Sequence, residues 1–184
     1  MAQAQAPEPL KYFIAILYRT SDALELGKRA LSEEWGKIDF EGKDHLFDMT
    51  EYYKPEMGAP LFRRLVTFEN LLLPTELVGM KLGCNQIEDR LAVSGHRIVN
   101  LDAGYLDHNK VVLASVKNFG HKIYLDRGIY ADCVGLYKQG RYQPFDWTFP
   151  DFKDGRYDEE LLTIRQRYLQ QMRQWRKRHD TPEK

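Results

Sequence analysis

The chain has 184 residues, of which 43% are hydrophobic, and its 27 Lys and Arg residues balance its 27 Asp and Glu residues. This length is typical of one domain that can bury a sizeable core. A net charge of zero gives no overall attraction to nucleic acid or anionic lipid, so such binding would need a local patch. The two cysteines, Cys84 and Cys133, exclude a multiply cross-linked secreted scaffold and favour a reducing compartment.

The first nine residues, MAQAQAPEP, are small, polar and proline-bearing, and they lack the charged and apolar regions of a secretory signal. We expect residues 1–10 to be a disordered tail and residues 11–184 to form a single α+β domain. No apolar run approaches the roughly 20 residues that a membrane-spanning helix needs. The sequence therefore predicts a cytoplasmic protein with no membrane partner.

The apolar run YFIAILY at residues 12–18 predicts a central strand that is buried on both faces. We expect the strands at 61–70 and 97–101 to flank it. A helix should follow, with Ser21 as its N-cap and Gly36 at its end. Its apolar residues recur at helical spacing: Leu24, Leu31 and Trp35.

Two short strands are expected around residues 38–40 and 45–47, and a glycine- and proline-bearing loop at 50–60. Pro74 should then open a second helix. Its apolar stripe recurs at spacings of three and four residues: Leu77, Met80, Cys84, Ile87 and Leu91. The order β-α-β-β-α-β predicts an α+β fold with a ferredoxin-like core, in which two helices cover one antiparallel sheet.

After the strand at 97–101, Asp102-Ala103-Gly104 predicts a turn, and Asp107 is a candidate cap for a helix from about His108 to Asn118. We expect three antiparallel strands at residues 122–125, 129–138 and 141–145. An aromatic loop at 145–155 and a last helix at about 159–178 should follow. The ferredoxin-like core would thus be extended by an extra helix, a β-hairpin and a C-terminal helix.

The signatures of several common reactions are absent from the sequence. It has no G-x-x-x-x-G-K-[ST] phosphate loop and no G-x-G-x-x-G fingerprint. Neither C-x-x-C nor H-E-x-x-H occurs, so no metal site is predicted. The G-x-S-x-G elbow of hydrolases is also missing. The sequence therefore specifies no cofactor, no reaction and no oligomeric state, and it leaves open whether the protein is an enzyme.

Reactive polar side chains concentrate between residues 97 and 132. On a helix at 108–118, Lys110 and Lys117 would share one face, about 10 Å apart along the axis. His121 would lie just beyond the C-terminus of that helix, where its protonated form is favoured. These features suggest a cluster of positive charge.

Two further residues complete the proposed cluster. Arg127 lies at a glycine turn that can present its guanidinium to a phosphate or carboxylate, and Asp102 could orient a cation or act as a base. The first hypothesis is a cleft for a phosphorylated or otherwise anionic ligand, such as a nucleotide. Asp102 and His121 are its candidate catalytic residues, and its candidate ligand-binding residues are Lys117, Arg127, Tyr105, Lys110 and Asp132.

The second hypothesis is a non-catalytic interaction module that binds RNA or a protein through the aromatic loop at 145–152 and the basic C-terminal helix. The loop aromatics could form a platform for a base together with two tyrosines, the full set being Tyr52, Tyr53, Trp147 and Phe149. Polar residues at helical spacing beside the second apolar stripe suggest a surface ion-pair row or the edge of a pocket: Lys81, Asn85 and Glu88.

Four segments between about Lys11 and Phe152 also carry a family resemblance: FDMTEYYKPEMG (47–58), NLDAGYL (100–106), LASVKNFGHKIYLDRGIYADC (113–133) and WTFPDF (147–152). They resemble, in order, a bacterial and archaeal family known as domain of unknown function 4416. Ala103 stands where we expect the proline of the family pattern Asn-Leu-Asp-Pro-Gly-Tyr. Members are sometimes labelled GTP-binding, but the stretch Asn109-Lys110-Val111-Val112 lacks the Asp of a guanine-binding Asn-Lys-x-Asp motif. The resemblance therefore supports the choice of segments and implies no established activity.

Overall fold

The computed structural model describes residues 3–179, which form a mixed α/β fold around one nine-stranded sheet. The ends of the predicted tail and domain, residues 1–2 and 180–184, lie outside the described residues. The strands are β1 (Lys11–Tyr18), β2 (Ile38–Glu41), β3 (His45–Leu46), β4 (Phe62–Phe68), β5 (Val99–Leu106), β6 (Lys110–Ser115), β7 (Ile123–Asp126), β8 (Ile129–Lys138) and β9 (Arg141–Pro144). The helices are α1 (Ser21–Trp35), α2 (Lys54–Met57), the 3-10 turn η1 (Pro74–Glu76), α3 (Leu77–Leu91), α4 (Pro150–Lys153) and α5 (Asp158–His179).

The strand order is β2-β4-β1-β5-β6-β8-β7, with β3 beside β4 and β9 beside β8. The pairings between these strands are antiparallel. Every residue of β1 is buried, and the strand pairs with β4 on one side and β5 on the other. The prediction of a central strand at 12–18, flanked by the strands that begin near 61 and 97, is confirmed.

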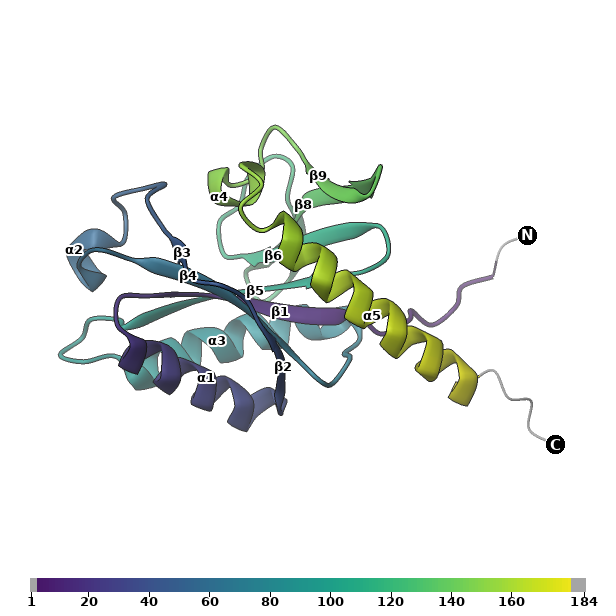
Figure 1. Ribbon diagram of the computed structural model, residues 1–184, viewed down its shortest axis with the longest axis horizontal. Coiled ribbons are helices and arrows are strands. Elements are labelled where there is room, and N and C mark those ends of the chain that lie inside the picture. The colour runs from purple at the N-terminus through teal and green to yellow at the C-terminus, as the bar shows by residue number, and fades with distance from the viewer. Residues whose placement is uncertain (1–2, 180–184) are drawn as a thin grey trace.

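Both faces of the sheet are covered around β1. Alternate β1 side chains, such as Ile14 and Ile16, pack with the buried residues of α1 and α3, whereas Phe13 and Ala15 pack with those of α5. Figure 1 shows α1 and α3 together below the sheet and α5 crossing its opposite face. Full burial of each large apolar side chain contributes roughly 1.5–3 kcal/mol, so this three-layer region holds most of the stabilising apolar contact.

The long helices begin and end close to the predicted positions. The N-cap of α1 is Thr20, one residue before the predicted Ser21, because the Thr20 hydroxyl accepts a hydrogen bond from the Ala23 amide at 3.3 Å. The α3 stripe is confirmed, with four of its members buried and Leu91 packed at its margin. Helix α5 extends the predicted range by one residue at each end. No helix among the described residues is long and apolar enough to cross a membrane.

The predicted turn at Asp102-Ala103-Gly104 is wrong, because β5 continues through these residues to Leu106. Gly104 lies within the strand, where the lack of a side chain allows close packing. A Cβ at this position would lie 2.7 Å from the Phe13 ring and 2.7 Å from the Val112 carbonyl oxygen. Only glycine therefore lets the neighbouring strands approach this closely.

The predicted helix at 108–118 is also wrong, since residues 110–115 form β6 between β5 and β8. Asp107 accepts hydrogen bonds from the amides of Asn109 and Lys110, at 2.7 and 2.8 Å. The same side chain that suggested a helix cap thus closes the turn between two strands, as Asp side chains commonly do. The extra helix of the predicted extension is therefore a strand.

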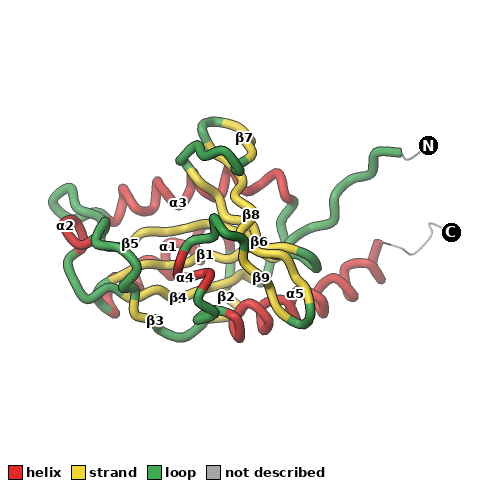
Figure 2. The backbone as a smooth tube through the Cα atoms, turned by 90° about the horizontal axis from the view of Figure 1, so that it is seen from above, coloured by secondary structure: helices red, strands yellow, loops and turns green. Residues whose placement is uncertain are grey.

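The rest of the extension is close to the prediction. The β7–β8 turn places Arg127 and Gly128 at φ of 47° and 79°, the left-handed conformation that suits a two-residue hairpin. Strand β9 pairs with β8, as predicted. The expected loops at 50–60 and 145–155 each contain a single helical turn, α2 and α4. Figure 2 shows β7 at the outer end of the sheet, projecting beyond the helices.

Candidate functional site

Asp102 belongs to a network of charged side chains from β4, β5 and α4. Arg63 of β4 donates to Asp102 of β5 at 2.9 Å and also pairs with Asp151 of α4. Since Leu17 of β1 lies opposite Arg63 in the register, the guanidinium crosses β1 to reach Asp102. Tyr157 donates to Asp151 at 3.1 Å. Arg63 thus joins three segments that are distant in the sequence.

The electrostatics of Arg63 follow from this enclosure. Its side chain is 6% exposed, and the Phe47 ring lies 4.4 Å from the guanidinium carbon. Burial alone would lower the pKa of Arg63, but the charges of Asp102 and Asp151 outweigh it and raise that pKa. The guanidinium is therefore fixed as a cation between two carboxylates.

Two side chains of α3 complete the network at the edge of β5. Strand β6 pairs with β5 only from Gly104 to Leu106, so the β5 backbone near Leu101 has no strand partner on that side. Glu88 accepts from the Leu101 amide at 2.6 Å, and Lys81 donates to the Leu101 carbonyl at 2.9 Å. The Lys81 ammonium also lies 4.0 Å from Asp102. The predicted surface ion-pair row is therefore wrong, because Lys81 and Glu88 are buried and replace a missing strand.

Arg97 links this network to α2. It pairs with Glu56 at 2.7 Å and with Glu88 at 3.3 Å. Hydrogen bonds from Arg97 lower the pKa of Glu56 to about 2, whereas burial raises the pKa of Glu88. Across the whole network, four carboxylates surround three cations: Glu56, Glu88, Asp102 and Asp151 around Arg63, Lys81 and Arg97. With all seven groups ionised, its formal charge is −1.

A second polar group surrounds the buried carboxylate of Asp132 on β8. His121 Nε2 lies 3.3 Å from Asp132 Oδ1, and Lys122 Nζ lies 3.1 Å from Asp132 Oδ2. Lys122 also donates to Ser115 at 2.8 Å. The structure therefore brings together two predicted residues, His121 and Asp132. The sequence analysis did not select Lys122. This residue begins the predicted strand at 122–125, and the alternation of side chains along paired strands could have indicated that it shares a face with Asp132.

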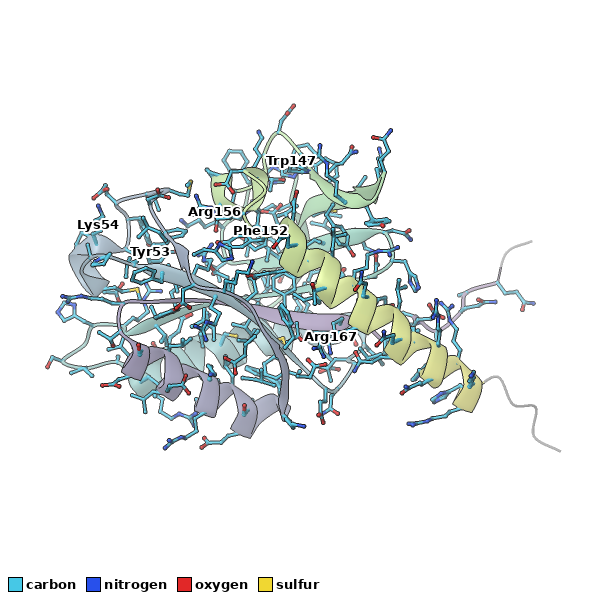
Figure 3. The ribbon with its side chains drawn as sticks, viewed as in Figure 1. Tyr53, Lys54, Trp147, Phe152, Arg156 and Arg167 are labelled. Carbon is cyan, nitrogen blue, oxygen red and sulfur yellow. The ribbon has the colours of Figure 1, made fainter. Side chains whose placement is uncertain are left out.

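Aromatic residues of the loop before α4 lie over this group. Trp147 stacks on His121 at 4.9 Å and on Phe145 at 4.6 Å, and the Phe149 ring lies 5.5 Å from the Lys122 ammonium. Figure 3 shows Trp147 above α4 and Tyr53 at α2, on separate parts of the molecule. Tyr53 and Trp147, two of the four aromatics proposed as a platform for a base, therefore lie apart.

Each of the remaining predicted site residues contacts a different side chain. Lys110 pairs with Asp107, Arg127 pairs with Asp126 at 3.3 Å, and the Tyr105 ring packs 5.6 Å from that of Tyr12 in the core. The Lys117 ammonium lies 5.0 Å from the Tyr52 ring. No metal-binding group of three or more His, Cys, Asp or Glu side chains occurs among residues 3–179.

Several exposed apolar side chains come from the segments around the Asp132 group. We call this set the apolar edge, and its residues come from the β6–β7 loop, β7 and the loop before α4: Val116, Phe119, Ile123, Tyr124, Leu125, Trp147 and Phe149. Ring contacts that run from Phe119 through His121 to Trp147 connect the two loops. Sequence analysis missed this surface because a run such as KIYL predicts a strand without revealing whether anything covers it.

Comparison with known proteins identifies the family of this chain. The chain belongs to the family described as a domain of unknown function (DUF4416), whose model matches residues 8–168. The resemblance noted in the sequence is therefore confirmed. No curated protein and no solved structure matches the chain significantly.

Proposed function

We propose that this protein is an interaction module that binds a protein partner through the apolar edge. The observation that carries the proposal is the exposure of β7, where Ile123, Tyr124 and Leu125 are 69%, 57% and 39% exposed. Contiguous exposed apolar side chains commonly mark interaction sites, and an uncovered strand edge offers unpaired backbone groups as well.

The charges favour this function over an anionic ligand in the 97–132 region. Arg97, Lys110, Lys122 and Arg127 each have a carboxylate partner, and His121 Nε2 lies 3.3 Å from the Asp132 carboxylate without a hydrogen bond between them. An incoming phosphate would have to displace these partners. The negative excess around Asp102 opposes an anion there in the same way.

The charges also favour a protein partner over RNA. Nucleic-acid affinity comes largely from cations that contact phosphates. Arg165 of α5 donates to the His108 carbonyl and lies 3.6 Å from the Tyr137 ring, and Arg176 pairs with Glu8 at 2.7 Å. These arginines serve the fold, and the apolar edge itself consists mainly of aliphatic and aromatic side chains.

We also infer that the first half of the chain is a ferredoxin-like core, as the sequence suggested. The order β2-β4-β1-β5, the antiparallel pairing and the packing of α1 and α3 against one face support this inference. In such a core β5 would be an edge strand. Strand β6 extends the sheet from that edge, and this extension is what carries the apolar edge.

Photo-crosslinking in cells that contain the protein tests the proposed function. A benzoylphenylalanine at Phe119 should give covalent protein adducts, whereas the same group at Leu26 on α1 should give none, although that residue is 43% exposed. RNA adducts would favour the RNA-binding form of the second hypothesis, and the absence of adducts at Phe119 would contradict the proposal. Thermal-shift measurements with inorganic phosphate and nucleotides should show no stabilisation.

A further inference from the structure

We propose that His121, Asp132 and Trp147 form a pH-sensitive clasp, which holds the two loops of the apolar edge together when His121 is protonated. This inference rests on the proposed function, because it describes how that binding surface is regulated. It follows from the position of His121 between the two loops, from its contact with Asp132 and from the charges around that contact.

His121 connects the two loops of the apolar edge. Its ring stacks on Trp147 of the loop before α4 at 4.9 Å, and it lies 5.6 Å from the ring of Phe119 in the β6–β7 loop. Both neighbouring rings are exposed members of the apolar edge. A change in the state of His121 therefore acts on the relative position of two parts of that surface.

The two loops differ in how firmly the rest of the protein holds them. The Trp147 indole donates to the Cys133 carbonyl at 3.0 Å, and the Thr148 hydroxyl donates to the Val134 carbonyl at 2.7 Å, so the loop before α4 is fixed to β8. By contrast, residues 116–120 of the β6–β7 loop are all exposed. Segments with few buried contacts open more readily than the core. The β6–β7 loop is therefore the part that the clasp can hold or release.

The contact between His121 and Asp132 depends on charge. His121 Nε2 and Asp132 Oδ1 lie 3.3 Å apart, and both atoms are buried without a hydrogen-bond partner. In this geometry a neutral imidazole gains little from the carboxylate, whereas a protonated ring forms an ion pair with it. Stacking on Trp147 also favours the protonated ring, because the face of an indole attracts a cation.

Two charged groups face His121 among residues 3–179, and they act in opposite directions. Asp132 attracts the protonated ring, whereas Lys122, whose ammonium lies 3.1 Å from the other oxygen of Asp132, repels it. The aromatic neighbours Phe119 and Trp147 carry no charge. Because the contact with Asp132 is direct and the stack on Trp147 adds to it, we expect the protonated ring to be held more tightly than the neutral one.

The expected response to pH follows from this preference. Histidine changes charge between about pH 5 and 8, and the His121 side chain is 18% exposed, so protons from the solvent reach it. The clasp should form as the pH falls through that range and should be lost as the pH rises. A surface that is already ordered loses less conformational freedom on binding, so the partner should bind more tightly at the lower pH.

The fluorescence of Trp147 tests the clasp, since a protonated imidazole in contact with an indole quenches its emission. Trp175→Phe provides the background, because Trp175 stacks on His179 at 4.2 Å and would respond in the same way. The remaining tryptophan, Trp35, packs against Phe68 and should give a constant signal.

In that background, the emission should fall as the pH is lowered from about 8 to about 5. His121→Gln should remove this change. His96→Gln replaces an exposed histidine, so it is the matched control and should retain the change. An emission change that survives His121→Gln, or no change in the parent chain, would overturn the inference.

Substitutions at the contact test the two charges. Asp132→Asn removes the attraction and should move the midpoint of the emission change to lower pH, whereas Lys122→Met removes the repulsion and should move it to higher pH. Lys122→Arg keeps the positive charge and should leave the midpoint nearly unchanged. Circular dichroism identifies a variant that fails to fold. If Asp132→Asn does so, the two Lys122 variants still test the charges, and equal midpoints in them would overturn the inference.

Photo-crosslinking at two pH values separates this inference from the proposed function. A benzoylphenylalanine at Ile123 on β7 leaves the rings of the clasp intact. In cell lysate, its protein adducts should be more abundant at about pH 6 than at about pH 8, and His121→Gln should abolish the difference. Equal yields at the two pH values would overturn this inference and leave the proposed function supported. A pH-dependent Trp147 emission without any adduct would support the clasp and contradict the proposed function.

Discussion

Strands β1 and β7 are both rich in apolar residues, yet β1 is buried along its whole length and every residue of β7 is exposed. The difference lies in their neighbours. Strand β1 has β4 and β5 at its sides and helices over both faces, whereas β7 has one strand beside it and lies at the outer end of the sheet. Apolar content alone therefore does not decide burial, and an apolar strand left uncovered indicates a surface for binding.

Ion pairs show the same contrast. Arg63 on β4 is enclosed with two carboxylates, and Arg127 at the β7–β8 turn is exposed beside Asp126. Charges enclosed by protein are expensive to leave unpaired, whereas exposed pairs contribute little. The two regions should therefore respond very differently to the same substitution.

The largest expected effect is that of Arg63→Met, which keeps much of the side-chain volume but removes the cation paired with Asp151 and leaves Asp102 with only the Lys81 ammonium at 4.0 Å. We expect a loss of about 3–5 kcal/mol in the free energy of unfolding, measured by urea denaturation. Arg127→Met is the matched control and should change stability by less than about 0.5 kcal/mol. Similar losses from the two substitutions would show that the Arg63 network does not stabilise the sheet.

Truncation of isoleucine compares the two strands directly. Ile14→Ala in β1 should cost about 2–5 kcal/mol, because it removes fully buried methyl groups and leaves a cavity. Ile123→Ala in β7 should cost less than about 0.5 kcal/mol, because that side chain is exposed. Urea denaturation measures both, and a loss above about 1 kcal/mol at Ile123 would mean that β7 is covered.

The smallest expected effect is a dependence on pH at the link between α2 and β5. Arg97 lowers the pKa of Glu56 from 4.5 to about 2, so the folded state binds this proton less readily than the unfolded state. The pair therefore contributes stability above about pH 4.5, and this contribution is lost as the pH falls towards 2. In Glu56→Gln, urea midpoints should fall less steeply over that interval than in the unmodified chain. Parallel curves would contradict the assignment.

The candidate site was only partly predictable. Asp102, His121 and Asp132 were chosen as reactive residues, and the structure pairs the last two. Their partners came from segments that carry no local signal of contact, such as Arg63 on β4 and Asp151 on α4. Those contacts join residues 39 and 88 positions apart in the chain, which no local pattern can specify.

The sequence by itself determined the elements whose signal is local. The apolar run at 12–18, the stripes of α1, α3 and α5, and the glycine turns of the two hairpins each identified their structure because propensity, periodicity and turn chemistry agree there. Tertiary structure decided the rest. Residues 110–115 are a strand because β5 and β8 lie on either side, and β7 is exposed because neither a strand nor a helix of the described chain covers it. Strand pairing and burial are set by distant segments, and those contacts outweigh local preference where the local signal is short.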